Sequence, residues 1–428
     1  MSVKLNQQDE QMLNGQKGPA ARMAMRIMVR MADVVEAPEM MDVSQAHIDG
    51  CGLLSDTGLE FAETLAAKRA KVSIPTTLNM GPLDLQNWKQ FGVNEDFAAK
   101  AIRQAKAYTD MGCIPTWTCA PYQSYLTPRF GRQIAWGESN AICYANSVLG
   151  ARTNRYGDFI DICAAITGRV PKCGLHLKKN RKGQILLKLI DVNPAVMQSN
   201  AFFAVLGHLT GSLADDKIPV IEGLPVKVSS DQLKAFCAAA ASSGAVALFH
   251  AVGITPEANT LEEAFQGQPP ERTIDIHLSD LQKAASELST AHEGLNLDLV
   301  ILGCPHFSFD EFRELSELIL AQTEKGQTLH PDVRFIVISS QTSYSLLQRS
   351  DFINVLTDFG VEITLDTCMF HTPMVSKDTK VIMTNSGKCA YYAPGELSVK
   401  VAFGSMADCV DSAVNGFVCQ KESLWKKS

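Results

Sequence analysis

The sequence predicts an α/β protein of several lobes, with three-layer α/β/α packing, mainly parallel sheets, and a site at the carboxyl ends of strands between lobes. Two observations support this prediction. From residue 229 onward, apolar stretches with strand character alternate with helical stretches, the pattern of a parallel sheet covered on both faces. The 428 residues also exceed the roughly 250–300 at which a single hydrophobic core stops growing. We therefore expect two or more lobes.

The first half of the chain contains clear helical stretches. Residues 18–36 place Met and Val at helical spacing with Arg between them, which predicts an amphipathic helix whose Met face lies in the core. A second helix is expected to be capped at Asn94 and stopped by Gly112. A third helix opens at Ser139 or Asn140.

The middle of the chain is expected to contain a β-rich segment and the boundary between two lobes. Residues 170–211 predict a β-rich segment, and the basic run KKNRKG at 178–183 predicts a charged hairpin tip. A connector at about 215–225 then separates a first lobe, 1–220, from a second lobe, 225–428.

The second lobe is predicted to be doubly wound. Its strands are expected at 245–253, 297–304, 334–340, 361–368 and 380–387, and its helices at 229–244, 279–291, 309–323 and 344–360. In open α/β sheets, ligands bind just beyond the carboxyl ends of the strands. Residues at these strand exits are therefore the first candidates for a functional site.

Three of the twelve cysteines stand in such places. Cys304 ends a strand and is followed by Pro305, Cys368 ends another strand, and Cys119 lies in a Pro-punctuated loop, where Cys113 competes with it. Their long separations match no local zinc or ferredoxin motif, but they suit a thiol site built from separate loops. Three thiolates would leave an iron one open position for Lewis-acid chemistry. The alternative, that these thiols are small buried hydrophobic residues, stays open.

Polar groups follow two other strands. The turn after residue 383 contains Ser386 and Lys388, which could hold an oxyanion through backbone amides and an ammonium group. In the first half of the chain, Asn79 places its side-chain amide just after a predicted strand. An ordinary Asn-Ser-Gly turn is the alternative for the first of these segments.

A third group of polar residues surrounds the helix that opens at Ser139 or Asn140. The free amides at the start of that helix could hold an anion. Arg152 and Arg155, on either side of Asn154, are candidates for binding a carboxylate or a phosphate. Surface pairing of the two arginines with nearby aspartates is the alternative.

Charge and hydropathy narrow the class of protein. The net charge of −7 disfavours a nucleic-acid binder, because phosphate contacts require a basic face. No run reaches the roughly 18 apolar residues that cross a bilayer. The polar first residues lack the apolar core of a secretory signal, so we expect a cytoplasmic protein.

Eight motifs occur in an order that resembles a known family. They are TTLN at 76–79, TCAPY at 118–122, WGESNA at 136–141, GARTNR at 150–155, GITPEA at 253–258, GCPH at 303–306, LDTC at 365–368 and TNSGK at 384–388. Together they resemble the large, catalytic subunit of aconitase X, a divergent branch of the aconitase superfamily, over essentially residues 1–428. The resemblance implies an aconitase-like fold and an iron-sulfur hydro-lyase.

The resemblance also implies ligands and substrates. Cys119, Cys304 and Cys368 would hold the iron-sulfur cluster, whose type (2Fe-2S, 3Fe-4S or 4Fe-4S) stays open, as does a contribution from Cys113 or Cys389. Two substrates are known in the family. We favour dehydration of cis-3-hydroxy-L-proline to Δ1-pyrroline-2-carboxylate, and the alternative is dehydration of mevalonate 5-phosphate.

The resemblance finally implies a partner. Members of the family use a small swivelling domain marked by a PLSFWGG-like segment, which this sequence lacks. We therefore expect a small subunit that forms a heterodimer with this chain and could supply the general base. Two other classes compete with the lyase: a thiol hydrolase that uses Cys119 or Cys304 with His306, and an iron-sulfur sensor that binds RNA.

Overall fold

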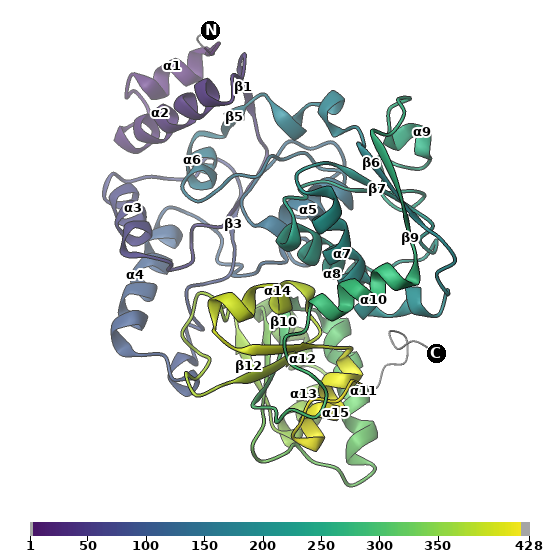
Figure 1. Cartoon of the computed structure of the whole chain (residues 1–428). Coiled ribbons are helices and arrows are strands. Elements are labelled where there is room, and N and C mark those ends of the chain that lie inside the picture. Colours follow the sequence, from purple (N-terminus) through teal and green to yellow (C-terminus); the bar gives the residue numbers. More distant parts are fainter. Residues whose placement is uncertain (1–2, 421–428) are drawn as a thin grey trace. The chain divides into compact units, whose positions relative to one another are not determined.

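The computed structural model describes residues 3–420, which form two compact units (Figure 1). The first unit ends at Lys182 and the second begins at Gly183. This boundary lies before the one expected at 220–225. The reason is that β6 (Ile185–Leu189) pairs in parallel with β7 (Pro219–Glu222), which joins residues on both sides of the expected boundary in one sheet.

The first unit combines helices with short strands. Its α-helices are α1 (Gln7–Leu13), α2 (Pro19–Val34), α3 (Asp56–Ala67), α4 (Glu95–Asp110), α5 (Ser139–Ser147) and α6 (Ile160–Thr167). Its strands are β1 (Met40–Asp42), β2 (Ala46–Ile48), β3 (Thr76–Leu78), β4 (Ala135–Trp136) and β5 (Arg169–Pro171). Strands β3, β2 and β4 form a parallel sheet, and β1 pairs antiparallel with β5.

The expected helices of the first unit are confirmed. The Met face of α2 is buried, with Met25 and Met28 fully covered in the core of this unit. Helix α4 begins after Asn94, whose side chain accepts a hydrogen bond from the Phe97 amide at 2.8 Å. Gly112 follows the end of α4 with a positive φ of 95°.

Two expectations about the middle of the chain were wrong. Residues Lys178–Arg181 form a 3-10 turn, because the buried guanidinium of Arg181 donates to the carbonyl oxygens of Asn146 and Leu175 at 2.8 and 3.1 Å. The segment expected to be β-rich contains only β5 and β6 as strands, and its end lies in helix α7 (Asn200–Ala214). The run AFFAVLGHLTG is apolar almost throughout, so its periodicity could not distinguish a buried helix from a strand.

The second unit begins with a four-stranded parallel sheet. The strand order is β8 (His250–Ala251), β7, β6 and β9 (Arg272–Ile276). Helices α8 (Ser230–Ser243), α9 (Leu261–Ala264) and α10 (Leu278–Glu287) complete this part, and α7 packs along α8.

A five-stranded parallel sheet follows, in the order β12, β11, β10, β13, β14, as predicted for a doubly wound region. Its strands are β10 (Leu299–Phe307), β11 (Arg334–Ser339), β12 (Val361–Leu365), β13 (Val381–Thr384) and β14 (Lys400–Phe403). Its helices are α11 (Phe309–Thr323), α12 (Gln341–Leu347), α13 (Phe352–Phe359), α14 (Gly387–Glu396) and α15 (Met406–Asn415). Figure 1 shows α14 on one face of this sheet and α11, α13 and α15 on the other.

None of the helices within residues 3–420 combines the length and the apolar character that crossing a bilayer requires.

Candidate active site

The five-stranded sheet has a topological switch point between β10 and β13. From β10 the chain continues to β11 and β12 on one side, and from β13 it continues to β14 on the other. The connections therefore diverge at the carboxyl ends of β10 and β13, the place where open α/β sheets bind ligands. Cys304 follows Leu302 on β10, and Asn385 and Ser386 follow β13.

Gly303 fixes the position of Cys304. Its φ is +94°, and a Cβ at this position would lie 2.0 Å from the carbonyl oxygen of Ile338 on β11. Only glycine allows this close approach together with a left-handed backbone. The register between β10 and β11 shifts after Leu302, at this glycine. The thiol of Cys304, the next residue, is partly exposed.

Ser386 connects the two strand ends. It is the N-cap of α14, where its Oγ accepts a hydrogen bond from the Cys389 amide at 3.0 Å and donates one to the carbonyl oxygen of Cys304. Lys388 lies half-buried in the first turn of the same helix. The segment predicted as an oxyanion-binding turn is thus the start of a helix, whose free amides favour negative charge.

The loop that carries Cys368 is tied to the same place. Nε2 of His306, two residues after Cys304, lies 2.7 Å from the carbonyl oxygen of Thr367. The carbonyl oxygen of Cys368 accepts hydrogen bonds from the amides of His371 and Thr372 at 3.1 and 2.9 Å. His306 therefore acts as a structural link between the two thiol-bearing segments.

Cys389 lies between these segments but is fully buried. Burial raises the pKa of its thiol, and the proximity of Cys304 and Cys368 raises the same pKa further. Its Sγ lies 3.7 Å from Sδ of Met369. Cys304, Cys368 and Cys389 thus share one region of the second unit, and Cys389 is the fully buried member.

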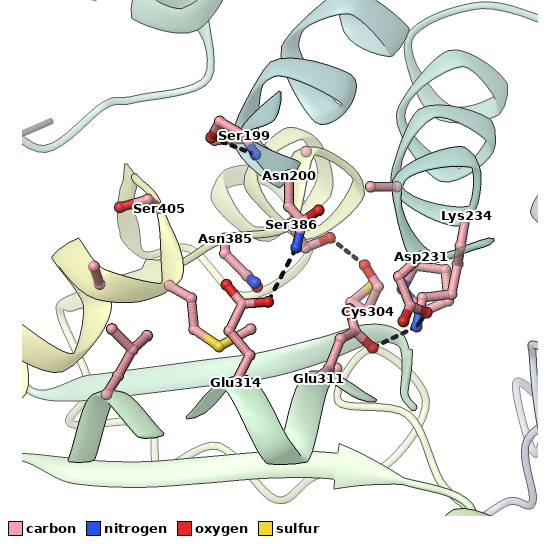
Figure 2. Close-up of a pocket in the computed structure, with 18 of the residues that line it drawn as sticks. Ser199, Asn200, Asp231, Lys234, Cys304, Glu311, Glu314, Asn385, Ser386 and Ser405 are labelled. Carbon is pink, nitrogen blue, oxygen red and sulfur yellow. Dashed lines mark hydrogen bonds and ion pairs between the residues drawn. The ribbon is translucent and has the colours of Figure 1, made fainter. Parts of the chain in front are cut away.

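A cavity of about 540 Å³ opens beside Cys304 (Figure 2). Its polar lining includes side chains from the strand ends (Cys304, Asn385, Ser386), from α8 (Asp231, Lys234) and from α11 (Glu311, Glu314). Asn200, the first residue of α7, contributes an amide. A cavity of this size and mixed lining is typical of small-molecule sites.

Lys234 is the only one of these charged side chains that is fully covered. Its Nζ donates to the carbonyl oxygen of His306 at 3.1 Å and pairs with Asp231 Oδ1 at 3.0 Å and with Glu311. Burial alone would lower the pKa of Lys234, but the two carboxylates outweigh it and raise the pKa. The lysine therefore remains charged and holds the backbone that follows Cys304.

The start of α11 adds to this network. The amide of Ser308 donates to Glu311 Oε2 at 2.8 Å and the amide of Glu311 donates to Ser308 Oγ at 3.1 Å, which forms a capping box. Ser308 Oγ also donates to Asp231 at 2.7 Å, which attaches the end of β10 to α8. The segment from Cys304 to Ser308 is thus held on several sides.

In the first unit, Asn140 supports the loop of Cys119. Its Nδ2 donates to the carbonyl oxygen of Cys119 at 2.8 Å and to Glu138 at 2.6 Å, and its Oδ1 accepts from Tyr122 Oη at 2.6 Å. Ser139 Oγ donates to Glu138 at 3.3 Å. Asn140, predicted as a substrate ligand, has its amide committed to shaping the thiol loop.

Asn154 has a comparable structural role. Its Nδ2 donates to the carbonyl oxygen of Cys173 at 3.2 Å, and its Oδ1 accepts from the Leu175 amide at 2.7 Å. Arg155 is exposed, whereas Nε of Arg152 is buried and has no hydrogen-bond partner among residues 3–420.

Asp161 was one possible partner for Arg152 and Arg155, but its carboxyl group binds backbone amides instead. Its carboxyl accepts from the backbone amides of Asp49 and Ile162, both at 2.6 Å. Burial raises the pKa of Asp161 to about 8. Asn79, also buried, donates to the carboxylate of Asp49.

The donor chemistry fits an iron-sulfur cluster. Four of the twelve cysteines are partly exposed, namely Cys119, Cys173, Cys304 and Cys368, and the other eight are buried. Cys304 and Cys368 lie in one region of the second unit, and cysteine thiolates are the usual ligands of iron-sulfur clusters. Within the described part of the chain, no group of three or more Cys, His, Asp or Glu side chains is already arranged around a metal position. Because Cys119 belongs to the first unit, its convergence with the other two stays a prediction.

Sequence reasoning missed the charged lining of the cavity: Asp231, Lys234, Glu311 and Glu314. Two signals were present. Asp231 and Lys234 stand three residues apart at the start of an Ala-rich helix, where a lysine facing the core needs a partner. Ser308 and Glu311 have the spacing of a capping box.

Comparison with known proteins places the whole chain in one family. Models of three successive domains match: the aconitase X first domain at residues 2–179, the second domain at 183–286 and the third domain at 297–415. The first boundary agrees with the division at residue 182.

Individual relatives are also similar over most of their length. A cis-3-hydroxy-L-proline dehydratase of Pseudomonas aeruginosa is 43% identical over 411 residues, 95% of this chain and 69% of that protein. The phosphomevalonate dehydratase large subunit of Methanothermobacter thermautotrophicus is 37% identical over 92% of this chain and 94% of its own. The crystal structure of Thermococcus kodakaraensis aconitase X in its holo-form superimposes with a TM-score of 0.82 at 30% identity, covering 94% of this chain and 97% of that one.

Proposed function

This chain belongs to the aconitase X family, and from that membership we propose that it is a hydro-lyase that dehydrates cis-3-hydroxy-L-proline. Loss of water from this β-hydroxy amino acid gives an enamine, which tautomerises to Δ1-pyrroline-2-carboxylate. The single observation that carries the choice of substrate is the 43% identity to a cis-3-hydroxy-L-proline dehydratase over 95% of the chain. The identity to the phosphomevalonate dehydratase large subunit is lower, at 37%.

The proposed cofactor is an iron-sulfur cluster held by Cys119, Cys304 and Cys368. When bound, it would supply a Lewis-acidic iron that assists the departure of the hydroxyl group. The partial exposure of all three thiols, and the nearness of Cys304 and Cys368 to Cys389, support this assignment.

The remaining chemistry requires groups that hold the substrate carboxylate and move a proton. We assign the carboxylate or the developing oxyanion to the amino-terminal end of α14, where Ser386 and Lys388 lie beside Cys304. Ser386 Oγ already donates to the carbonyl oxygen of Cys304, so its main contribution is to position that segment. The general base is assigned to the partner subunit.

Substrate contacts from the first unit are proposed for Asn79, Ser139, Arg152 and Arg155. Among these, Arg152 has a buried Nε without a partner in the described residues, which suits an arginine that meets an anion. Asn140 and Asn154 are proposed to act through the loops that they hold.

The proposed partner is a small swivelling subunit. It is supported by the match to a protein named as a large subunit, which extends over 94% of that subunit.

The function is tested by assaying the reconstituted protein with its small partner on cis-3-hydroxy-L-proline and mevalonate 5-phosphate in parallel. We expect turnover of hydroxyproline with a kcat/KM at least about a hundredfold above that for the phosphorylated acid, equal to about 3 kcal/mol of discrimination. Preferential turnover of mevalonate 5-phosphate would replace the proposal by the alternative.

A further inference from the structure

The cavity beside Cys304 is acidic. Besides Cys304, its ionisable lining consists of Lys234, Asp231, Glu311 and Glu314. The ammonium of Lys234 has three N–H donors, and it contacts three acceptors: the carbonyl oxygen of His306, Asp231 and Glu311. No donor of this lysine is left for a substrate carboxylate or phosphate.

Glu314 differs from the other two carboxylates. It lies one turn beyond Glu311 on α11, and Oε2 accepts a hydrogen bond from Asn200 Nδ2 at 3.2 Å. Within residues 3–420, no cation forms an ion pair with Glu314. The neighbouring Arg313 pairs instead with Asp310 and Glu317 on the exposed side of the helix, at 3.4 and 3.6 Å.

Glu314 lines the same cavity as Cys304 and Ser386, two residues that are proposed to take part in the site. Figure 2 shows its carboxylate directed toward Asn200 and Asn385, and Ser386 and Cys304 line the same cavity. Burial raises the pKa of Glu314, and the nearby Asp231 adds to this effect. A carboxyl group in such surroundings gains most from a cation that enters the cavity.

We propose that Glu314 binds the protonated secondary amine of the substrate and thereby selects an amino acid over an unaminated hydroxy acid. The inference rests on the proposed function, because cis-3-hydroxy-L-proline carries this ammonium group and mevalonate 5-phosphate does not. The lining has one ammonium group, which is already paired, and three carboxyl groups, so it offers no free cation to a phosphate that carries about −1.5 to −2 charges at neutral pH.

The test uses two inhibitors that differ only at the ring heteroatom. L-Proline has the ring ammonium, and (S)-tetrahydrofuran-2-carboxylate has an oxygen there. Both are measured as competitive inhibitors of cis-3-hydroxy-L-proline dehydration by the complete enzyme. A charge-assisted hydrogen bond contributes about 1.5–3 kcal/mol, so the wild type should prefer L-proline by roughly tenfold to a hundredfold.

Substitution of Glu314 by Gln should abolish this preference and leave inhibition by the oxygen analogue within about twofold. Glu314→Asp retains the charge and should restore part of the preference, which a purely structural role would not predict. Glu317→Gln is the matched control, because Glu317 lies one turn further on α11, is exposed, and does not line the cavity. It should behave like the wild type.

Retention of the full L-proline preference in Glu314→Gln, with an active wild type, would overturn this inference and leave the proposed function intact. A wild type that fails to dehydrate cis-3-hydroxy-L-proline would instead overturn the proposed function. If Glu314→Gln does not fold, the wild type is compared with Glu314→Asp instead. An equal preference for L-proline over the oxygen analogue in these two proteins would count against the contact.

Discussion

At the scale of single residues, two buried histidines make the first unit sensitive to acid. His47 lies against Thr77, with Nδ1 and Oγ1 2.8 Å apart, and His176 contacts Gln133 and Tyr156 at 2.6 and 2.5 Å. Burial lowers the pKa of each histidine to about 4 from an ordinary value of 6.5. Both side chains are therefore neutral in the folded chain at pH values where they would be protonated in the unfolded chain.

We predict that the first unit loses stability as the pH falls from about 6.5 to about 4. In this window each of the two histidines binds more protons in the unfolded chain than in the folded one, which lowers the free energy of unfolding as the pH falls. Asp161, whose pKa is raised to about 8, acts in the opposite direction, but it is one group against two. The loss should reach about 2 kcal/mol per histidine at pH 5. Tryptophan fluorescence during urea unfolding is a suitable probe, because Trp88, Trp117 and Trp136 lie in this unit.

The control for this prediction is the double variant His47→Gln/His176→Gln. Removal of both histidines should eliminate the loss of stability that they cause and leave the opposite contribution of Asp161, whose raised pKa stabilises the folded chain as the pH falls. Between pH 7.5 and 5 the free energy of unfolding of the variant should therefore rise by about 4 kcal/mol relative to that of the wild type. An equal pH dependence in both proteins would show that these histidines are not the responsible groups.

The hydrogen bonds of the predicted site residues could not be foreseen from the sequence, and their proposed roles stay predictions. Ser386 was expected to hold an oxyanion, and its Oγ contacts the carbonyl oxygen of Cys304. Asn140 and Asn154 were expected to bind substrate, and both bind loop backbones. An amide side chain suits either role equally, so only the three-dimensional neighbourhood distinguishes them.

At the scale of elements, the path of β10 depends on Gly303. We predict that Gly303→Ala destabilises the second unit by about 3 kcal/mol or more, because the new methyl group would collide with the Ile338 carbonyl and the backbone is left-handed. Urea unfolding of the full chain measures the change, and the iron content of the variant should fall with it, because Cys304 is the next residue.

Gly326→Ala provides the matched control. Gly326 also has a positive φ, of +75°, but a Cβ there would meet no atom within 4 Å. Only the backbone strain remains, so the cost should be about 1 kcal/mol. Equal losses in the two variants would mean that the approach of β10 to β11 does not constrain the residue before Cys304.

Four strands of the five-stranded sheet could be predicted because their hydrophobic patterns were distinct, whereas β14 was not predicted. Each expected strand from residue 297 onward corresponds to a strand of the five-stranded sheet, and the helices between them follow in order. Helix α7 was missed because its apolar residues cover all sides. The turn at Lys178–Arg181 was missed because the acceptors of Arg181 lie far away in the sequence.

At the scale of the whole molecule, we predict that the chain is inactive until its small partner is added. The proposed general base belongs to that partner, so the reconstituted single chain should bind iron but turn over hydroxyproline at less than about one hundredth of the rate of the complete enzyme. Titration with the small subunit during a dehydration assay provides the measurement. Full turnover by the single chain would contradict the proposed division of roles.

The convergence of distant thiols is the feature that sequence spacing predicts least well. Cys119, Cys304 and Cys368 are separated by whole elements, and no local motif relates them. Their common property, partial exposure among mostly buried cysteines, becomes visible only in the structure. The resemblance to aconitase X supplied the ligand set, and the parallel direction of β10, β11 and β12 explains physically why Cys304 and Cys368 lie at one edge of a sheet.

The most direct test of this account is the iron content per chain of the single variants Cys119→Ala, Cys304→Ala and Cys368→Ala, compared with Cys173→Ala. Cys173 is the fourth partly exposed thiol and contacts Asn154 at 3.6 Å, so it controls for the loss of an accessible cysteine. We predict that each of the first three variants loses most of its iron and its visible absorbance, while Cys173→Ala retains both. Wild-type iron content in any of the three would contradict the proposed cluster site.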